Sequence, residues 1–181
     1  MICELDSENP YQLLVATILS AQCTDAMVNL ATPAVFARDP DAFALVAADE
    51  VELQELVRAT GFYKAKSHNL LKMGKQLTDD HHGEVPTALK DLVKLGGVGR
   101  KTANVIRTVS FGLSGLPVDT HVGRLVRRLG ITEEEDPVKV ELALNPLVPE
   151  LERGPFSLRV ILHGRQVCFA RKPNCPSAFN T

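Results

Sequence analysis

The chain has 181 residues, of which 45% are hydrophobic, and a formal net charge of −2. This length allows a sizeable buried core, in one compact unit or in two small ones. No eighteen-residue apolar run and no N-terminal signal pattern are present, so we expect neither a membrane span nor secretion. Without a signal, the four cysteines favour reduced thiols and a cytoplasmic location; they are Cys3, Cys23, Cys168 and Cys175.

Positive charge gathers in two parts of the chain. The stretch from Lys90 to Arg128 holds eight Lys or Arg residues and two acidic ones, and the stretch from Arg153 to Lys172 holds five cations and no anion. Acidic residues gather elsewhere, mainly at 39–55 and 133–152. A basic stretch of this kind is typical of a surface that binds a polyanion, although a chance mixture of solvated faces is an alternative.

The N-terminal part predicts apolar helices. Every long segment of the chain repeats its apolar residues at helical spacing and no alternating run stands out, so we predict an all-α protein. Asn9 and Pro10 fit the N-cap and the first residue of a helix that ends near Gln22. Thr24 is expected to cap the next helix. A fresh start is predicted at Thr32-Pro33, because proline breaks a helix interior.

Two short helices and a longer one are predicted next. Asp39-Pro40-Asp41 begins the first of them. Asp49 and Glu52 form the capping-box pattern of the second, and Gly61 is expected to end it in the left-handed conformation. The longer helix then runs through Leu77.

Three glycines in four positions, Gly96, Gly97 and Gly99, predict a tight turn between two helices. The free N–H groups and the positive dipole end at the start of the second helix form a site for an anion such as phosphate. A dinucleotide-binding fingerprint and a phosphate loop do not fit, because no strand precedes the turn and the glycine spacing differs. A helix-to-helix turn without a ligand is the alternative.

A second motif lies downstream, at Val118-Asp119-Thr120-His121. It follows Pro117 and precedes an apolar run of helical spacing. Asp119 is therefore predicted at a helix N-terminus, where a carboxylate is favoured. Taken alone, the pattern is that of an ordinary N-cap. Further helices are predicted from Asp136 and from Phe156 to Leu162.

The two motifs together resemble the endonuclease III family of DNA repair glycosylases, over about residues 9–177. The run Gly97 to Asn104 is similar to the helix-hairpin-helix of that family, and Lys101 and Asp119 have the eighteen-residue interval of its catalytic pair. The resemblance implies a six-helix domain with the hairpin, here residues 7–115, and a C-terminal helical domain, here residues 116–181.

The same resemblance implies a bifunctional DNA glycosylase and AP lyase of base excision repair that removes oxidised pyrimidines. Lys101 would attack the sugar and form a Schiff base that permits β-elimination 3′ to the abasic site, and Asp119 would accept a proton or stabilise the positive sugar. Burial of Lys101 near Arg100 would favour the neutral amine that attack requires. The alternatives are an 8-oxoguanine-type glycosylase and a catalytically weak or inactive DNA-binding protein in which Lys101 only clamps phosphate.

Other residues are predicted to contact the partner, which is double-stranded DNA with a damaged base or an abasic site. Gln22 matches a family glutamine that fills the space of the extruded nucleotide, and Phe62 stands where the family has an apolar wedge. A turn role for Gln22 and burial of Phe62 are the alternatives, and Lys64 and Lys66 are phosphate contacts or surface lysines. The remaining predicted contacts are Gly97, Gly99, Arg100, Thr120, His121, Arg171 and Lys172. We expect a monomer, on the nucleoid if the organism is bacterial.

The family carries a [4Fe-4S] cluster on four cysteines spaced C-x6-C-x2-C-x5-C, and a cluster of this kind needs four thiolates. Cys168 and Cys175 match the first two positions, Ala178 stands at the third, and the sequence ends before the fourth. We therefore predict an incomplete cluster loop, with Cys168 and Cys175 as vestigial positions, and no metal or other cofactor. The initial helix that packs on the second domain in the family is also not expected.

Overall fold

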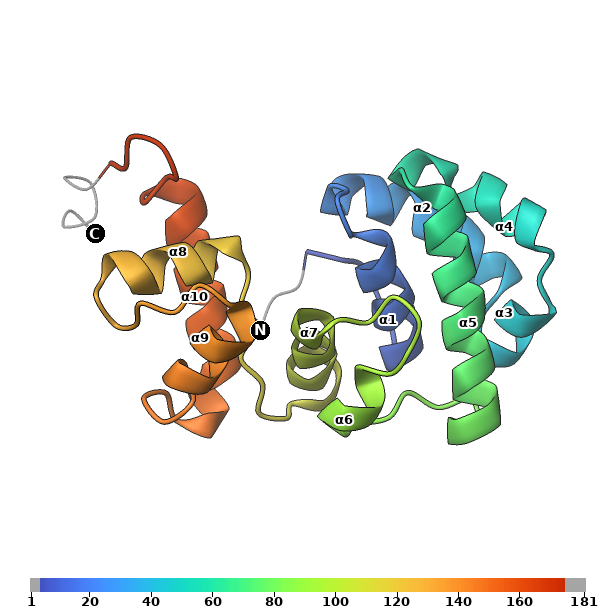
Figure 1. Cartoon of the computed structure of the whole chain (residues 1–181). Helices are drawn as coiled ribbons and strands as arrows, with labels where there is room; N and C mark the ends of the chain where they lie inside the picture. The colour runs from blue at the N-terminus through green and yellow to red at the C-terminus, as the bar shows by residue number, and fades with distance from the viewer. Residues whose placement is uncertain (1–3, 175–181) are drawn as a thin grey trace. The chain divides into compact units, whose positions relative to one another are not determined.

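The structure is a computed structural model that describes residues 4–174. These residues form helices and turns and include no strand, so the all-α prediction is confirmed. The chain divides into two compact units, an N-terminal unit that ends at Phe111 and a C-terminal unit that begins at Gly112. Figure 1 labels the helices of both units.

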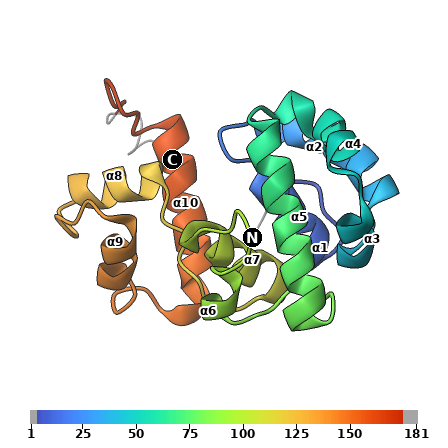
Figure 2. The same cartoon turned by 45° about the vertical axis from the view of Figure 1, so that its right-hand side comes forward.

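The N-terminal unit is built around α5, its longest helix, which lies beside α3 and α4 in Figures 1 and 2. Helix α1 packs against α2, α5 and α7. The apolar core of the N-terminal unit includes Leu14, Leu45 and Leu70, all fully buried. The elements are α1 Pro10–Leu19, α2 Asp25–Arg38, α3 Ala42–Ala47, α4 Glu50–Val57, the 3-10 helix η1 Arg58–Thr60, α5 Tyr63–His81, α6 Leu89–Leu92 and α7 Arg100–Phe111.

Side-chain caps begin these helices as the sequence predicts. Asn9 Oδ1 accepts a hydrogen bond from the backbone N–H of Gln12 at 2.9 Å. Asp49 Oδ1 accepts from the N–H groups of Val51 at 2.9 Å and of Glu52 at 3.0 Å. Each such cap satisfies a donor that the helix leaves open, and typically stabilises the fold by about 1 kcal/mol.

The helix boundary predicted at Thr32-Pro33 is wrong, because α2 continues through Pro33 to Arg38. The Pro33 ring is exposed, whereas Val28, Thr32 and Val35 are buried. A proline inside a helix costs about 3 kcal/mol. Burial of apolar side chains on both sides of Pro33 offsets this cost, at about 1.5–3 kcal/mol for a fully buried Val or Leu.

The C-terminal unit consists of α8 Thr120–Arg128, α9 Pro137–Leu144, the 3-10 helix η2 Glu150–Glu152 and α10 Arg153–Gln166. Helix α10 is longer at both ends than the predicted run from Phe156 to Leu162, and packs against α8. Its first turn contains Pro155, which fits there because the first N–H groups of a helix have no partner within it. The core of the unit includes Leu116, Val118, Val122, Val126, Val140 and Leu144.

The connection between the predicted domains belongs mainly to the C-terminal unit. The predicted boundary lies between residues 115 and 116, a few residues after the division at Phe111. Ser157 Oγ donates a hydrogen bond to the carbonyl oxygen of Pro117 at 2.5 Å, and Arg153 Nη1 donates to Ser114 Oγ at 3.0 Å. Helix α10 therefore fixes the segment that leads into α8. Among residues 4–174, no helix has the length and apolar character required to span a bilayer.

Candidate nucleic-acid interface

The glycine-rich turn between α6 and α7 lies on the surface of α5. Gly97 has a φ of +74°, which an L side chain rarely adopts. At Gly96 an added Cβ would lie 2.6 Å from the carbonyl oxygen of Asn69 in α5. The predicted helix-turn-helix is therefore present, and the fold requires glycine at two of its positions for different reasons.

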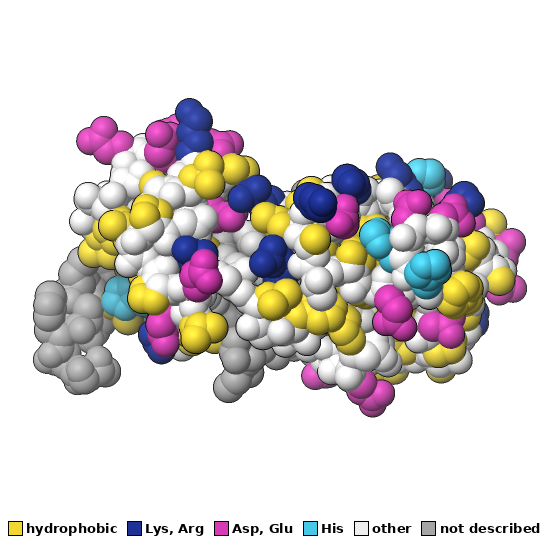
Figure 3. Space-filling model, turned by 90° about the horizontal axis from the view of Figure 1, so that it is seen from below, with side chains coloured by type: hydrophobic (Ala, Val, Ile, Leu, Met, Phe, Trp, Pro, Cys, Tyr) yellow, Lys and Arg dark blue, Asp and Glu magenta, His cyan; other side chains and the backbone are white. Residues whose placement is uncertain are grey.

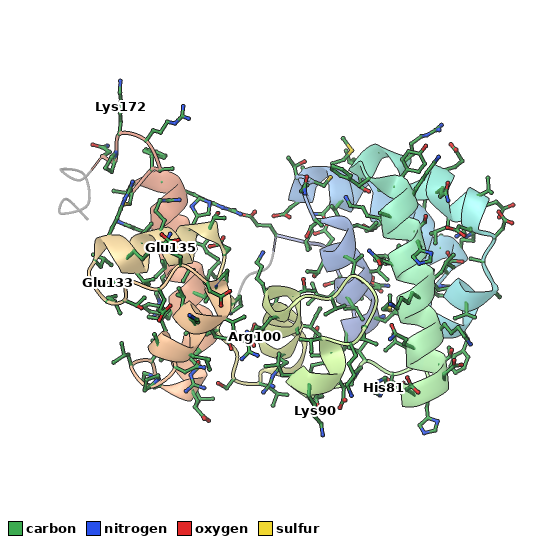
Figure 4. All side chains as sticks on the ribbon, viewed as in Figure 1. His81, Lys90, Arg100, Glu133, Glu135 and Lys172 are labelled. Carbon is green, nitrogen blue, oxygen red and sulfur yellow. The ribbon has the colours of Figure 1, made fainter. Side chains whose placement is uncertain are left out.

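The outer side of this turn presents backbone N–H groups. Within the part of the chain that the structure describes, the N–H groups of Gly97 and Gly99 have no hydrogen-bond acceptor, and both glycines are exposed. A Cβ on Gly99 would meet no atom within 4 Å, so a ligand can approach the backbone. Figure 4 shows Lys90 on α6 and Arg100 at the start of α7. The open amides and the positive end of α7 form a site suited to a phosphate group.

A glutamine of α5 holds the inner side of the turn. Gln76 Oε1 accepts a hydrogen bond from the N–H of Gly96 at 2.8 Å, and Gln76 Nε2 donates to the carbonyl oxygen of Lys94 at 3.0 Å. Its amide thus uses a donor and an acceptor on the same turn, as the side chain of glutamine allows. The turn is therefore fixed to α5 by polar contacts as well as by close packing.

Lys101 is the second residue of α7, and its side chain is exposed. The expectation that Lys101 is buried is wrong. The buried residues in this part of α7 are Ala103, Asn104 and Ile106, which lie on the face that packs against the core. Lys101 therefore has access to a ligand that binds the hairpin amides.

Gln22 and Phe62 are exposed and share an unusual backbone conformation. Gln22 has a φ of +53°, and Phe62 has a φ of +49° with a ψ of +29°. The predicted left-handed stop at Gly61 is wrong in detail, since Gly61 combines a φ of +71° with an extended ψ of 159°. Phe62 is 66% exposed, so its alternative as a core residue is wrong. Non-glycine residues in this region cost about 1–3 kcal/mol each and gather at functional sites.

Lys66 is not a surface lysine, contrary to expectation, because it is only 4% exposed. Its Nζ donates hydrogen bonds to the carbonyl oxygens of Leu19 at 2.7 Å and of Thr60 at 2.6 Å. Leu19 is the last residue of α1 and Thr60 the last of η1. Burial lowers the pKa of Lys66, since removal from water disfavours the charged form.

Asp119 caps α8, as predicted. Its Oδ1 accepts a hydrogen bond from the N–H of Val122 at 2.8 Å. Within the described residues Oδ2 takes no hydrogen bond and remains available to a ligand. Thr120 follows as the first residue of α8 and is exposed, and His121 is half-buried. The cap fixes the orientation of a carboxylate that keeps one free oxygen.

Arginines of α8 hold the segment that follows α10. Arg124 Nη2 donates to the carbonyl oxygens of Gly164 at 3.0 Å and of Cys168 at 2.8 Å, and lies 3.2 Å from His121 Nδ1. Arg128 donates to the carbonyl oxygens of Phe169 and Ala170, both at 2.8 Å. The guanidinium groups thus satisfy carbonyls at and beyond the C-terminus of α10.

Arg171 and Lys172 are exposed in this segment, and Figure 4 shows Lys172 at the bend beyond α10. In Figure 3, dark-blue Lys and Arg side chains lie on the surface of both units among yellow apolar side chains. The predicted contacts thus form local groups: the hairpin and the Gln22 and Phe62 segments in the N-terminal unit, and the start of α8 and the segment after α10 in the C-terminal unit.

Of the three cluster positions that the sequence contains, only Cys168 lies within the residues that the structure describes. Cys168 Sγ lies 3.1 Å from Arg128 Nη1, which donates a hydrogen bond to it. Residues 4–174 contain no group of three or more His, Cys, Asp or Glu side chains that could hold a metal ion. Cys175 and Ala178 lie outside the described residues, and the alanine has no donor atom for iron.

Comparison with known proteins gives the family and the fold of this chain. The sequence profile of the HhH-GPD superfamily base excision DNA repair proteins matches residues 15–150. The endonuclease III of Synechocystis sp. is 50% identical over 174 residues, which cover 96% of this chain and 80% of that protein. A solved structure described as a non-covalent endonuclease III–DNA complex superposes with a TM-score of 0.91 and 41% identity, covering 97% of this chain and 83% of the other.

A second solved structure is described as a trapped endonuclease III–DNA covalent intermediate. It superposes with a TM-score of 0.91 and 42% identity, over 97% of this chain and 83% of the other. The fold and the hairpin are thus those of a helix-hairpin-helix base excision repair protein. Within that class, the chain belongs to the endonuclease III family.

Four contributors to these surfaces were not identified from the sequence. Gln76 lies in an amphipathic helix without a motif, and Arg124 and Arg128 were counted only as positive charge. Lys66 was expected to contact phosphate or to lie on the surface, and lysine is rarely fully buried. Its position four residues after Phe62 was the available signal, since that spacing places it at the first turn of the following helix.

Proposed function

We propose that Lys101 is the nucleophile and Asp119 its acid–base partner in this member of the endonuclease III family. The chain is a bifunctional DNA glycosylase and AP lyase of base excision repair that acts on double-stranded DNA. The observation that carries the residue assignment is the position of Lys101, exposed in the first turn of α7 and two residues after the open amide of Gly99.

The hairpin supplies the grip on the DNA backbone. The N–H groups of Gly97 and Gly99 donate to a phosphate, and Arg100 adds positive charge beside them. These contacts carry no sequence information, so they suit an enzyme that must act in any sequence context. A phosphate held at this turn brings the neighbouring sugar within reach of the Lys101 side chain.

The chemistry follows from an amine nucleophile. Neutral Lys101 Nζ attacks the sugar C1′ and forms a C–N bond, while the base leaves with the electrons of the glycosidic bond and takes up a proton. The free oxygen of Asp119 accepts the proton of the amine or stabilises the positive charge on the sugar. The C1′–O4′ bond of the sugar then breaks, with O4′ taking up a proton, which leaves a protonated imine between Lys101 and C1′. Transfer of a C2′ proton from this imine to a base then expels the 3′ phosphate, which cuts the strand. Water as the nucleophile would form no imine, so the lyase step requires the lysine.

Other predicted contacts act on the opened duplex. Extrusion of a nucleotide costs a few kcal/mol, and least for a lesion that pairs poorly. Gln22 fills the vacated space, and Phe62 stacks on the adjacent bases, which is worth about 1–3 kcal/mol per base. Thr120 and His121 at the start of α8, with Arg171 and Lys172 after α10, bind the backbone from the C-terminal unit.

We assign oxidised pyrimidines as the lesion class, on the resemblance of the motifs around Gln22 and Lys101 to the pyrimidine-specific members of the family. The enzyme acts as a monomer where the cell keeps its DNA, in the cytoplasm and on the nucleoid if the host is bacterial. No step uses a cluster, because with alanine at position 178 we infer that the loop holds none.

Borohydride trapping on a duplex with one abasic site tests the assignment. The wild-type chain should form a covalent adduct, and Lys101→Arg should form none while it still binds, because arginine keeps the charge but makes no imine. Lys75→Ala is the matched control, since Lys75 is an exposed lysine of α5 that pairs with Asp79. An adduct that persists in Lys101→Arg would exclude Lys101 as the nucleophile.

A further inference from the structure

One buried side chain connects the two segments that the proposed function inserts into DNA. Gln22 follows the last residue of α1 by three positions, and Phe62 follows the last residue of η1 by two. The carbonyl groups that close these helices belong to Leu19 and Thr60. Lys66 Nζ donates to both, at 2.7 Å and 2.6 Å. The two segments are thus attached to the same ammonium group.

The backbone of Lys66 makes a further contact with one segment. Its N–H donates to the carbonyl oxygen of Phe62 at 3.0 Å, which begins the hydrogen-bond ladder of α5. Lys66 therefore holds Phe62 from one side through its backbone and Thr60 from the other through its side chain. A shift of the Phe62 backbone relative to α5 would strain these hydrogen bonds.

The position of Lys66 is costly, which indicates a function other than general stability. Lys66 as a whole is only 4% exposed, and burial of a charge is unfavourable unless it is hydrogen-bonded. The two carbonyls are its only hydrogen-bond partners within the described residues. An apolar residue of similar volume would fill the same space without this cost.

The strain at Gln22 and Phe62 requires a restraint of this kind. Both residues hold positive φ values, +53° and +49°, that non-glycine residues rarely adopt. Such conformations persist only where the surrounding structure fixes the chain on both sides. Lys66 supplies a fixed point three residues before Gln22 and two residues before Phe62.

We propose that Lys66 is a positioning residue that couples Gln22 to Phe62, so that the two side chains enter the DNA as one rigid unit. The inference rests on the proposed insertion of Gln22 and Phe62. Lys66 touches neither DNA nor the reacting atoms, and acts through the backbone of the two segments. Lys66→Met keeps an unbranched apolar stem but removes the donor, and is therefore the informative change.

A double-mutant cycle on DNA binding tests the coupling. The probe is a duplex with one tetrahydrofuran abasic analogue, which the enzyme cannot cleave. In the chain with Lys66, Gln22→Ala and Phe62→Ala should each weaken binding about tenfold, Phe62→Ala through the loss of one stacking contact and Gln22→Ala through the loss of the side chain that fills the vacated space. The double variant should lose clearly less than the product of the two single losses, because a unit that has lost one member inserts poorly with the other.

In the Lys66→Met background the two losses should multiply, because each segment then acts alone. A merely structural role of Lys66 would weaken all binding, undamaged duplex included, and leave the coupling unchanged. The matched control is Lys75→Met on the same helix, which should reproduce the coupling of the wild-type chain. Thermal unfolding confirms that each variant is folded, and Lys66→Leu, which also removes the donor, replaces Lys66→Met with the same expected result if the latter does not fold.

The outcomes separate this inference from the proposed function. Losses that multiply in the chain with Lys66 overturn the coupling, whatever the Lys66 variants do, and so does coupling that persists in folded Lys66→Met. Wild-type binding that neither alanine substitution weakens overturns both the insertion and this inference, while borohydride trapping through Lys101 still tests the catalytic assignment separately. Coupling that is present with Lys66 and absent in Lys66→Met supports the positioning role.

Discussion

Asp119 Oδ1 lies 2.8 Å from the backbone nitrogen of Val122 and accepts its hydrogen bond at the start of α8. One oxygen of the carboxylate thus caps α8, and the other takes part in the proposed reaction. Substitution by asparagine should affect these two functions differently, because an amide oxygen can cap a helix but carries no negative charge.

Asp119→Asn should therefore separate the two. Asparagine caps a helix about as well as aspartate, so the free energy of unfolding should change by less than about 0.5 kcal/mol. Single-turnover cleavage of an abasic duplex should fall by about 10²-fold or more, as expected for loss of an acid–base group. Asp119→Ala should lose a further 1 kcal/mol or so of stability with its cap. Undiminished cleavage by Asp119→Asn would contradict the catalytic role.

Gly96 and Gly99 should respond oppositely to alanine. At Gly96 a Cβ would lie 2.6 Å from backbone atom O of Asn69, so Gly96→Ala should destabilise the fold by about 1–3 kcal/mol. At Gly99 a Cβ meets nothing and φ is not positive, so Gly99→Ala should cost less than about 1 kcal/mol. The methyl group of the new alanine at position 99 would instead obstruct the phosphate and weaken DNA binding. Urea unfolding and the Kd for an abasic duplex distinguish the two, and equal stability losses would refute this account.

Gln76→Ala should weaken the attachment of the glycine-rich turn to α5. It leaves the N–H of Gly96 and the carbonyl of Lys94 without their partner, which costs about 1–3 kcal/mol if water does not replace it. Hydrogen exchange should accelerate at residues 94–99, and binding to abasic duplex should weaken. Lys75→Ala, one residue away on the exposed side of α5, should change neither. Unaltered exchange in Gln76→Ala would show that packing alone holds the turn.

Alkaline pH should destabilise the fold through Tyr11. Burial, reinforced by the charges of Asp39 and Asp41, raises the pKa of Tyr11 above its usual range. Above about pH 10 the unfolded chain loses this proton and the folded chain keeps it, so stability is full below pH 10 and falls as the pH rises further. The lowered pKa of Lys66 acts oppositely, and stability gains from it as the pH rises towards about 10.4.

Urea unfolding between pH 8 and pH 11.5 measures this effect. Tyr11→Phe should lose about 1 kcal/mol at neutral pH with the hydrogen bond to the Asp39 carbonyl, and should lack the decline that wild type shows above pH 10. Comparison of the two chains removes the contribution of Lys66, which both contain. A decline of the same size in Tyr11→Phe would exclude Tyr11 as its source.

Local signals predicted where several helices begin. Asn9, Asp49, Asp119 and Asp136 cap helices because their short side chains reach the open N–H groups two or three residues ahead. Pro33 shows where such signals fail. A local rule counts the missing hydrogen bond, but it does not count the burial of neighbouring turns against other helices, which depends on the whole fold.

The motifs of the site could be predicted from the sequence, but the residues that hold those motifs in place could not. The glycines at 96–99 and the interval between Lys101 and Asp119 are features of sequence spacing, so they could be found before the fold was known. The exposure of Lys101 and the burial of Lys66 depend on which helix face meets the core, and lysine composition says nothing of that. The hydrogen bond between Gln76 and Gly96 joins residues 20 positions apart. Only the packing of α5 beneath the hairpin brings them together.

The left-handed backbone at Gln22 and Phe62 has a consequence for the search for damage. The protein without DNA already has this shape, so the ordering cost of the inserting segments is met at folding and not at each encounter. If these two side chains insert, the remaining resistance comes from the duplex, whose stacking and pairing must open to admit them. Discrimination would then reside in the deformability of the DNA. Preformed Gln22 and Phe62 segments would then meet every base-pair step of the DNA in the same conformation, and they would insert where a lesion stacks weakly.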